Sequence, residues 1–349
     1  MWWKNVIKRI YMIDFTSKAH WTLAVAAACL GFLFFIDLLR TRASGPLEFI
    51  STMETPLKGK QKMIWVTAID GSEPGLCHWK VALHTAQENS PSLHPVLLYY
   101  EIEDIETILQ PPELYAGVTM IRRAFKFKLP DRRPAAVFAR LESASVIMSA
   151  FRARLFGALQ ETLIDTHFLY TDTDVQFLKD VVPQSLPAPQ RVLYGGETVL
   201  KSSVPVNTGV MIVNVSWLAR EETSIFYFAK ANNFDFPSYD QGLFNSYLSG
   251  TNQTDRPLDD TFNWKAYWPP SRHIKILHWH GPKPFGDCSA CVLLTTKQLQ
   301  TTNVKHLNLT GSCPLCPQSY VNLFRLPEAL FAWKRRAEVF LELSGMICT

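Results

Sequence analysis

Short apolar runs alternate with longer amphipathic stretches between residues 63 and 277. Each apolar run has the length and composition of a buried strand; the runs are 63–68, 95–100, 168–170, 191–194, 209–213 and 274–277. Apolar residues at helical spacing predict helices at 81–88, 103–109, 144–163, 225–232 and 241–248. Strands that alternate with helices predict an α/β fold with a mixed, mostly parallel sheet, which we place at residues 63–286. The basic stretch 122–134 is expected to be a surface loop.

A longer apolar segment precedes this domain. Residues 21–39 are almost wholly apolar, and a helix of about 20 residues just crosses a bilayer. More basic residues precede the segment than follow it, which favours a cytosolic N-terminus. A small-residue tract at 26–28 would suit a cleaved signal peptide, but the apolar run continues through residue 36. We therefore expect a cytosolic tail at 1–20, a single-pass type II anchor at 21–39, a stem at 40–62 and a luminal domain in the Golgi or endoplasmic reticulum.

The character of the chain changes after residue 286, where we place a C-terminal extension, 287–349. Pro327 to Leu343 predicts a closing amphipathic helix with Gly345 as its stop. Seven cysteines are present, and without Cys29 of the apolar segment six remain: Cys77, Cys288, Cys291, Cys313, Cys316 and Cys348. The two Cys-x-x-Cys pairs suit either disulfides in a lumen or a zinc ribbon, and disulfide connectivity stays open.

Composition and charge narrow the function classes. The chain has 349 residues, is 47% hydrophobic and carries a formal net charge of +4. The small charge and the scattered basic residues argue against a nucleic-acid surface. Asn214, Asn252 and Asn308 begin Asn-x-Ser/Thr triplets, so the chain is a candidate glycoprotein.

Two carboxylates stand at the end of the strand run 168–170. Asp172 and Asp174 are two residues apart, so in an extended chain both side chains point to the same side. Two carboxylates held together repel unless a cation lies between them, and oxygen ligands suit Mg²⁺ or Mn²⁺. Acid-x-acid triplets also arise from composition alone, as Glu101-Ile-Glu103 does. The apolar strand before Asp172 favours a metal–diphosphate site.

Polar residues gather at the ends of the other predicted strands too, where ligands bind in open α/β sheets. They are Asp70, Gly195-Gly196-Glu197, Asn207-Thr-Gly209 and His278-Trp-His280-Gly281-Pro-Lys283. His280 is expected to be packed or hydrogen-bonded rather than metal-bound, and Asp240 also suits a helix N-cap.

Four separated blocks then carry a family resemblance: Leu169-Tyr-Thr-Asp-Thr-Asp174, Val206-Asn-Thr-Gly-Val-Met-Ile-Val-Asn214, Ser238-Tyr-Asp-Gln-Gly-Leu-Phe-Asn245 and Leu277-His-Trp-His-Gly-Pro-Lys-Pro-Phe285. In this order and spacing they resemble a family-8-type glycosyltransferase with the GT-A (Rossmann-like) fold, the group of glycogenin and bacterial lipooligosaccharide galactosyltransferases. The likeness spans residues 62–286.

The resemblance implies a role for each matching residue. Asp172, Asp174 and His278 would bind Mn²⁺ (or Mg²⁺). The residues implied at the nucleotide-sugar donor are Thr67, Ala68, Asp70, Arg154, Asp172, Thr173, Glu197, Asn207, Gly281 and Lys283. Asp240 and Gln241 would lie on the reactive face as catalytic residues.

The resemblance therefore implies a metal-dependent transferase that moves a sugar from a nucleotide diphosphate, usually a UDP-sugar, to a glycan, protein or lipid hydroxyl with retention of configuration. One alternative is an inverting transferase on the same scaffold, with Asp240 as general base. Others are a membrane-anchored sugar-binding protein with an inactive site and a cysteine-stapled adhesion or scaffold protein. The donor sugar, the acceptor, the linkage and the oligomeric state do not follow from the sequence.

Overall fold

The computed structural model describes residues 48–51, 61–71, 73–109, 112–125, 135–196, 206–249, 258–281, 283–284 and 327–348. The chain divides into two units, Met1–Leu47 and Glu48–Thr349, and all described residues belong to the second. No helix within the described ranges combines the length and apolar character needed to span a bilayer. Several predicted features lie outside these ranges: the anchor at 21–39, Glu197, Asn252, Asn308 and the cysteines at 288, 291, 313 and 316.

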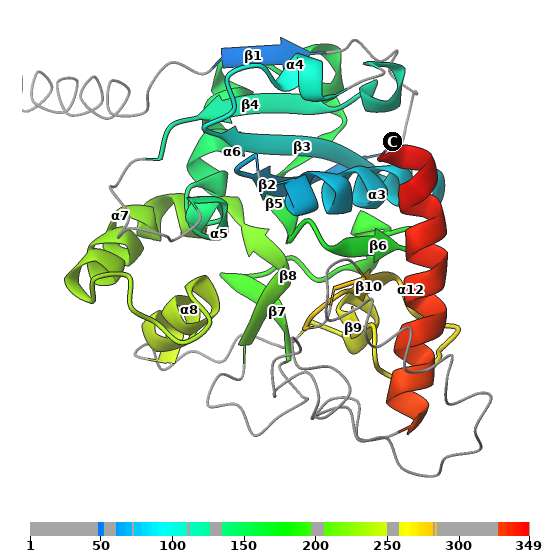
Figure 1. Ribbon diagram of the computed structural model, residues 1–349. Helices are drawn as coiled ribbons and strands as arrows, with labels where there is room; N and C mark the ends of the chain where they lie inside the picture. The colour runs from blue at the N-terminus through cyan, green and yellow to red at the C-terminus, as the bar shows by residue number, and fades with distance from the viewer. Residues whose placement is uncertain are drawn as a thin grey trace, which may run out of the picture. The chain divides into compact units, whose positions relative to one another are not determined.

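A seven-stranded mixed sheet lies at the centre of the second unit (Figure 1). In spatial order its strands are β1 (Glu48–Ser51), β4 (Thr119–Arg123), β3 (Leu93–Tyr100), β2 (Lys62–Ile69), β5 (Leu163–Thr171), β8 (Val206–Asn214) and β7 (Val192–Gly196). Strands β4, β3, β2 and β5 are parallel, whereas β1 and β8 run antiparallel to their neighbours. The predicted mixed, mostly parallel sheet is confirmed, and β1 adds an edge strand from within the segment predicted as a stem.

Helices and short 3₁₀ turns connect the strands. The helices are α3 (Glu73–Asn89), α4 (Ile105–Ile108), α5 (Ala135–Ala139), α6 (Ser143–Arg152), α7 (Val215–Ala231), α8 (Asp240–Ser249) and α12 (Pro327–Ile347). The 3₁₀ turns are η1 (Pro112–Tyr115), η2 (Gly157–Glu161), η3 (Pro183–Ser185) and η4 (Asp260–Phe262).

The central strand β2 is buried on both faces, which explains its continuous apolar sequence. Met63 and Trp65 share a core cluster with Trp79 and Leu83 of α3. Ile64 and Val66 point to the opposite face because successive side chains of a strand alternate, and α5 contacts β2 and β3. Helices on both faces thus hold the carboxyl ends of the parallel strands in place.

A second, three-stranded sheet adjoins the first. Strand β10 (Ile276–His278) pairs antiparallel with β6 (Val175–Phe177) and parallel with β9 (Trp264–Lys265). In this register, His278 lies opposite Val175 on one side and Lys265 on the other. The small sheet therefore brings a late strand of the chain beside the residue that follows Asp174.

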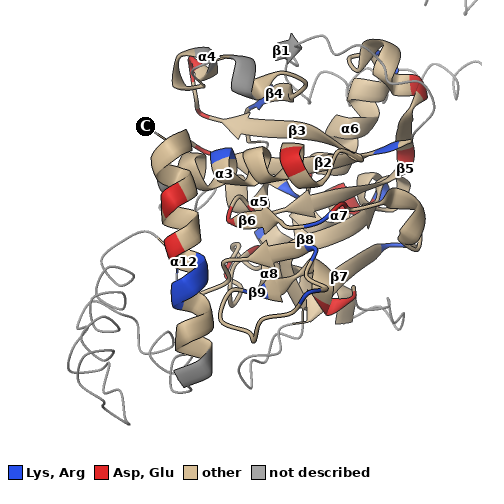
Figure 2. Ribbon diagram, turned by 90° about the vertical axis from the view of Figure 1, so that its right-hand side faces the viewer, with Lys and Arg blue, Asp and Glu red and all other residues tan. Residues whose placement is uncertain are grey.

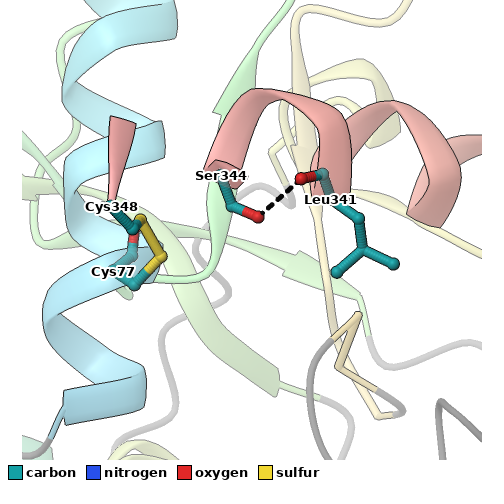
Figure 3. The surroundings of a disulfide bond; sticks show 4 residues. All are labelled: Cys77, Leu341, Ser344 and Cys348. Atoms are coloured by element: carbon teal, nitrogen blue, oxygen red, sulfur yellow. Dashed lines mark hydrogen bonds between the residues drawn. A yellow bond between two sulfur atoms is a disulfide. The ribbon is translucent and has the colours of Figure 1, made fainter. Parts of the chain in front are cut away.

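Helix α12 packs against α3 and the small sheet (Figure 1). Its apolar residues Leu330, Trp333, Ala337 and Phe340 recur at helical spacing and are buried against Trp279 and its neighbours. A disulfide between Cys77 of α3 and Cys348 joins the two helices, with 5.6 Å between the Cα atoms (Figure 3). Figure 2 shows basic and acidic residues dispersed over the described elements, both signs occurring on α12.

Several sequence predictions differ from the structure, and one of them is the helix predicted at 225–232, which belongs to α7 and already begins at Val215. The helix predicted at 144–163 ends at Arg152, because Arg154 adopts a left-handed backbone with φ of 54°, and Leu163 already begins β5. The stretch 122–134 was expected to be a loop, yet Arg123 belongs to β4 and is buried beside Glu142. Gly345 does not stop α12, which continues to Ile347.

Candidate active site

The start of β8 lies beside the end of β5 because the two strands are antiparallel. Thr171 pairs with Val210, and the Asp172 N–H donates to the carbonyl of Gly209 at 2.9 Å. The segment of Asp172 and Asp174, which follows β5, therefore lies next to Asn207 and Gly209 at the start of β8. Both aspartates line the same cavity.

His278 completes a cluster with the two aspartates. Its Nε2 atom lies 3.6 Å from Oδ1 of Asp174 and 4.0 Å from Oδ2 of Asp172. One ligand atom of each residue lies within 4.8 Å of the others. The adjoining Trp279 N–H donates to the carbonyl of Asp174 at 2.9 Å, which fixes the histidine strand to the aspartate segment. The predicted convergence of Asp172, Asp174 and His278 is confirmed.

Each aspartate pairs with a basic side chain through the carboxylate oxygen that faces away from His278. Oδ1 of Asp172 accepts from Nη2 of Arg140 at 2.7 Å, and Oδ2 of Asp174 accepts from Lys283. Burial opposes the negative charge on Asp174, but the ammonium group of Lys283 outweighs burial and holds the pKa of Asp174 well below its ordinary value. Asp174 is therefore ionised, and one oxygen of each aspartate remains turned toward His278.

The cluster has the donor chemistry of a divalent-metal site. Burial, and then the positive charge of Lys265, lower the pKa of His278 to about 4, so its imidazole is neutral at neutral pH. A neutral imidazole with two carboxylate oxygens suits Mn²⁺ or a similar ion better than Ca²⁺, which takes oxygen ligands. Asp172, Asp174 and His278 are the residues that would hold it.

The cluster opens into a cavity of about 340 Å³. Its walls come from the ends of β2 and β5, from α5, from the starts of β8 and α8, and from the segment after β10. The lining residues are Ala68, His78, Ala136, Val137, Arg140, Tyr170, Asp172, Thr173, Asp174, Asn207, Thr208, Ser238, Tyr239, Asp240, Gln241, His278, His280 and Lys283. A cavity with this lining has room for a small polar ligand beside the cluster.

Most residues predicted for the site line this cavity: Ala68, Asp172, Thr173, Asp174, Asn207, Asp240, Gln241, His278 and Lys283. Thr67 is buried behind Ala68, and its Oγ1 makes no hydrogen bond to any group that the structure describes. Asp70 follows the end of β2, and Gly281 has a φ of 85° that favours glycine. Arg154 is exposed on the turn after α6 and is not among the lining residues.

Arg140 is the main residue of the site that the sequence did not predict. Its Nη1 lies 3.0 Å from Oδ2 of Asp240 and donates to the carbonyl of Thr208 at 2.6 Å, while Nη2 binds Asp172. The tripeptide Ala-Arg-Leu occurs twice, at 139–141 and at 153–155. The family resemblance pointed to Arg154 in the second copy as a residue at the donor, whereas the structure places Arg140 of the first copy in the cavity wall.

Asp240 is the first residue of α8 and is buried. Its carboxylate accepts from Thr208 Oγ1 at 2.6 Å and pairs with Arg140. Burial raises its pKa; Arg140 opposes the rise and Asp172 adds to it, which leaves the pKa at about 6. A carboxyl group that titrates near neutral pH and lines a cavity is a candidate for the reacting site.

Two further buried residues, Asn263 and Lys265, lie behind His278 and were not singled out in the sequence. Nδ1 of His278 lies 2.8 Å from Oδ1 of Asn263, and Lys265 Nζ donates to the same oxygen at 3.1 Å. His280 is hydrogen-bonded through Nδ1 to the hydroxyl of Tyr267 at 3.2 Å, as expected of a histidine outside the ligand set.

Comparisons with known proteins find solved structures with a similar backbone fold. No protein-family model matches the sequence, and no curated protein matches it. Among solved structures, the apo-form glycosyltransferase GlyE of Streptococcus pneumoniae TIGR4 is 16% identical with a TM-score of 0.48, over 65% of this chain and 56% of GlyE. The chain thus matches little more than half the length of GlyE.

A galactosyltransferase, LgtC in complex with donor and acceptor sugar analogs, is 15% identical with a TM-score of 0.49, over 82% of this chain and 97% of LgtC. The bifunctional glycosyltransferase WbbM in its apo form is 11% identical with a TM-score of 0.47, over 68% of this chain and 49% of WbbM. These similar structures are all glycosyltransferases.

Proposed function

We propose that this chain is a metal-dependent glycosyltransferase that moves a sugar from a nucleotide diphosphate, in the first place a UDP-sugar, to an acceptor hydroxyl with retention of configuration. The observation that carries the proposal is the convergence of Asp172, Asp174 and His278 beside Lys283 and Arg140 in one cavity. Such a site provides fixed positive charge next to a set of metal ligands, which is what a departing diphosphate requires.

A bound divalent ion would supply Lewis-acid stabilisation of the diphosphate. Lys283 is already held at the site, since its Nζ donates to Asp174 and to the carbonyl of Trp279 at 2.9 Å. Its ammonium group is partly exposed and lines the cavity. It can therefore bind a phosphate oxygen at the same edge of the cavity as the metal ligands.

The other wall of the cavity suits the sugar. Asp240 and Gln241 begin α8, and Asn207 Nδ2 donates to Oε1 of Gln241 at 3.1 Å. Arg140 binds both Asp172 and Asp240, so the distance between the metal ligands and these side chains is fixed. We assign Asp240 and Gln241 to the face of the sugar at which transfer occurs.

One observation favours the inverting alternative. A general base works best with a pKa close to the operating pH, and the pKa of Asp240 is raised to about 6. In an inverting reaction Asp240 would accept the proton of the acceptor hydroxyl. The anomeric configuration of the product, measured by NMR, separates the two mechanisms.

The test is to incubate the purified full chain with Mn²⁺ and a panel of nucleotide-sugars and to measure nucleoside diphosphate release. We expect release from at least one donor, its loss on chelation, and a fall of about 100-fold or more in Asp174→Ala. The control is Asp180→Ala, which removes a carboxylate that binds Ser92 away from the cavity. Metal-independent release, or full activity in Asp174→Ala, would refute the proposal; donor binding without release would favour the inactive sugar-binding protein.

We also propose that residues 21–39 anchor the chain as a type II membrane protein with the described domain in the Golgi or endoplasmic reticulum lumen. The disulfide between Cys77 and Cys348 supports an oxidising compartment. Protease protection in isolated microsomes tests the orientation: the domain should resist protease until detergent is added.

A further inference from the structure

We infer that Asn263 and Lys265 are positioning residues that set the direction of a buried hydrogen-bond chain running from His278 to Gln241. The inference rests on the proposed function, because His278 matters as a metal ligand. The chain joins His278, Asn263, Asn207 and Gln241 in that order, with Lys265 attached at Asn263. All five residues are at least nine-tenths buried, so water does not compete for these bonds.

The direction is fixed first from the β8 side. The backbone N–H of Gly209 can only donate, and it lies 3.3 Å from Oδ1 of Asn207. The oxygen of that amide therefore faces Gly209. The same oxygen lies 2.8 Å from Asn263, which must present its Nδ2 donor there. The oxygen of the Asn263 amide is consequently turned toward His278.

Lys265 fixes the same direction independently. Its side chain is fully buried, and Nζ lies 3.1 Å from Oδ1 of Asn263. An ammonium group has only donors, so the atom that it meets must be the oxygen. The donor at Asn207, which is the Gly209 N–H, and the donor at Asn263, which is Lys265, thus require the same orientation of the Asn263 amide.

The orientation of Asn263 determines which nitrogen of His278 carries the proton. Nδ1 lies 2.8 Å from the Asn263 oxygen, which can only accept, whereas the donor Nζ of Lys265 is farther away at 3.5 Å, so the shorter contact makes Nδ1 the protonated nitrogen. Nε2 then keeps its lone pair, and this atom faces Asp174 at 3.6 Å and Asp172 at 4.0 Å. Residues behind a ligand histidine commonly fix its tautomer and ring orientation in this way.

The other end of the chain reaches the catalytic wall. Asn207 uses its oxygen for Asn263 and Gly209, so its Nδ2 group donates to Oε1 of Gln241 at 3.1 Å. The Gln241 amide therefore turns its oxygen toward Asn207. A change at Asn263 is expected to disturb both the metal ligand and Gln241, although Asn263 itself does not line the cavity.

Two glycines leave room for this arrangement. A Cβ at Gly209 would lie 2.7 Å from Nε2 and 2.8 Å from Nδ1 of His278. A Cβ at Gly195 would lie 2.8 Å from both Cβ and Cγ of Asn263. These two side chains are therefore enclosed by backbone, which leaves them little freedom to adopt another rotamer.

The first measurement is Mn²⁺ binding to the full chain without nucleotide, followed by electron paramagnetic resonance of the free ion. We expect Asn263→Leu to weaken binding by about 10–100-fold, the usual effect of losing a partner behind a ligand histidine. Lys265→Met should weaken it less, because Gly209 still fixes the amide. Asn263→Asp should recover most of the affinity, since a carboxylate also accepts from Nδ1. Wild-type affinity in Asn263→Leu would overturn the inference.

Asn214→Leu is the matched control. Asn214 lies at the opposite end of β8 from Asn207, and its side chain also makes two hydrogen bonds, to Pro189 and Trp217. It does not line the cavity, so its loss should lower stability without changing Mn²⁺ affinity. Equal weakening in Asn214→Leu would show that Asn263→Leu acts through general destabilisation and would contradict a positioning role.

The second measurement is the tautomer of His278 in the metal-free chain, read from ¹⁵N NMR of labelled histidine and assigned with His278→Gln. We expect a protonated Nδ1 and an unprotonated Nε2 in the wild type. The reverse tautomer would overturn the inference even if Asn263→Leu failed to fold. If the wild type binds no Mn²⁺, the proposed metal-dependent function fails, while the tautomer still decides the role of Asn263.

Discussion

Arg140 and Asp240 form a buried ion pair, with 3.0 Å between Nη1 and Oδ2. Burial opposes the charge on Arg140, but Asp172 and Asp240 hold its pKa above the ordinary value. The guanidinium group also binds Asp172, so one side chain connects the metal-ligand segment to the first residue of α8.

Substitution Arg140→Lys should reduce the rate of transfer although it keeps the charge. A lysine ammonium cannot reproduce the planar fork that reaches Asp172, Asp240 and the carbonyl of Thr208 together. We expect kcat to fall by about 10²–10³-fold, measured as nucleoside diphosphate release with saturating donor. The control Arg220→Lys changes an exposed arginine of α7 and should leave kcat unaltered. A kcat within threefold of wild type for Arg140→Lys would show that the fork is dispensable.

The pH dependence of transfer should report the ionisation of Asp240. Its pKa is about 6, so the carboxylate form is lost as the pH falls through that value. If the ionised form is the active one, kcat should rise with pH through about 6 and level off above it. Asp240→Asn should remove this inflection as well as most of the activity. An inflection that persists in Asp240→Asn must come from another group.

Gly209→Ala should abolish Mn²⁺ binding. The added methyl group would overlap the ring of His278, which cannot move without leaving Asn263. Gly345→Ala is the control, because a Cβ there meets nothing within 4 Å in the last turn of α12. That change should leave Mn²⁺ binding unaltered and stabilise the fold by less than the roughly 0.5–1 kcal/mol that separates alanine from glycine in the middle of a helix. Titration of Mn²⁺ and urea unfolding of both variants check the two effects.

His94 should make the fold sensitive to mild acid. It lies on β3 with Nε2 2.9 Å from Thr119 Oγ1, and burial, followed by Lys62, lowers its pKa to about 4. Between pH 6.5 and 4 the imidazole of His94 takes up a proton in the unfolded chain but not in the folded chain. The contribution of His94 to the free energy of unfolding is therefore fully present above pH 6.5 and decreases as the pH falls. The contribution from this residue should drop by about 2 kcal/mol from pH 7 to pH 5. His94→Gln should show a smaller drop in urea unfolding; an unchanged drop would contradict this assignment.

Removal of the disulfide should destabilise the fold but leave α12 packed against its apolar neighbours. The double substitution Cys77→Ser with Cys348→Ser removes a cross-link between residues 271 positions apart. Loss of such a disulfide lowers the free energy of unfolding by about 2–4 kcal/mol. Trp333 and Phe340 remain buried against Trp279, so the helix should stay docked at neutral pH. Urea unfolding measures the loss, and retained Trp fluorescence checks the docking.

Local patterns in the sequence predicted the strands and the pair of aspartates, because Asp172 and Asp174 follow an apolar strand at a spacing of two. His278 was added by the family resemblance, which rests on a motif that contains a glycine and a lysine. Apolar runs of strand length were also sufficient to predict β2, β3 and β8, whose burial on both faces leaves little polar alternation.

Residues whose role depends on distant partners were missed. In the sequence Arg140 looks like any basic residue that follows a short helix, and its contacts with Asp172 and Asp240 distinguish it from Arg154. Lys265 lies on a strand of two residues, and sequence alone gives no reason to bury a lysine there. The pairing of Cys77 with Cys348 depends on how α12 packs against α3, which no cysteine spacing encodes.

Helix α12 also sets an order of events during synthesis. A nascent chain can form β2 to β10 before α12 has been made, but until then Trp279 and Val81 lack the apolar surface that covers them. Domains fold from the N-terminus as they are translated, and incomplete ones expose such surface to chaperones. Trp279, whose N–H donates to the carbonyl of Asp174, is therefore covered only once α12 has been translated, so a chain interrupted before Pro327 should expose this apolar surface and bind chaperones.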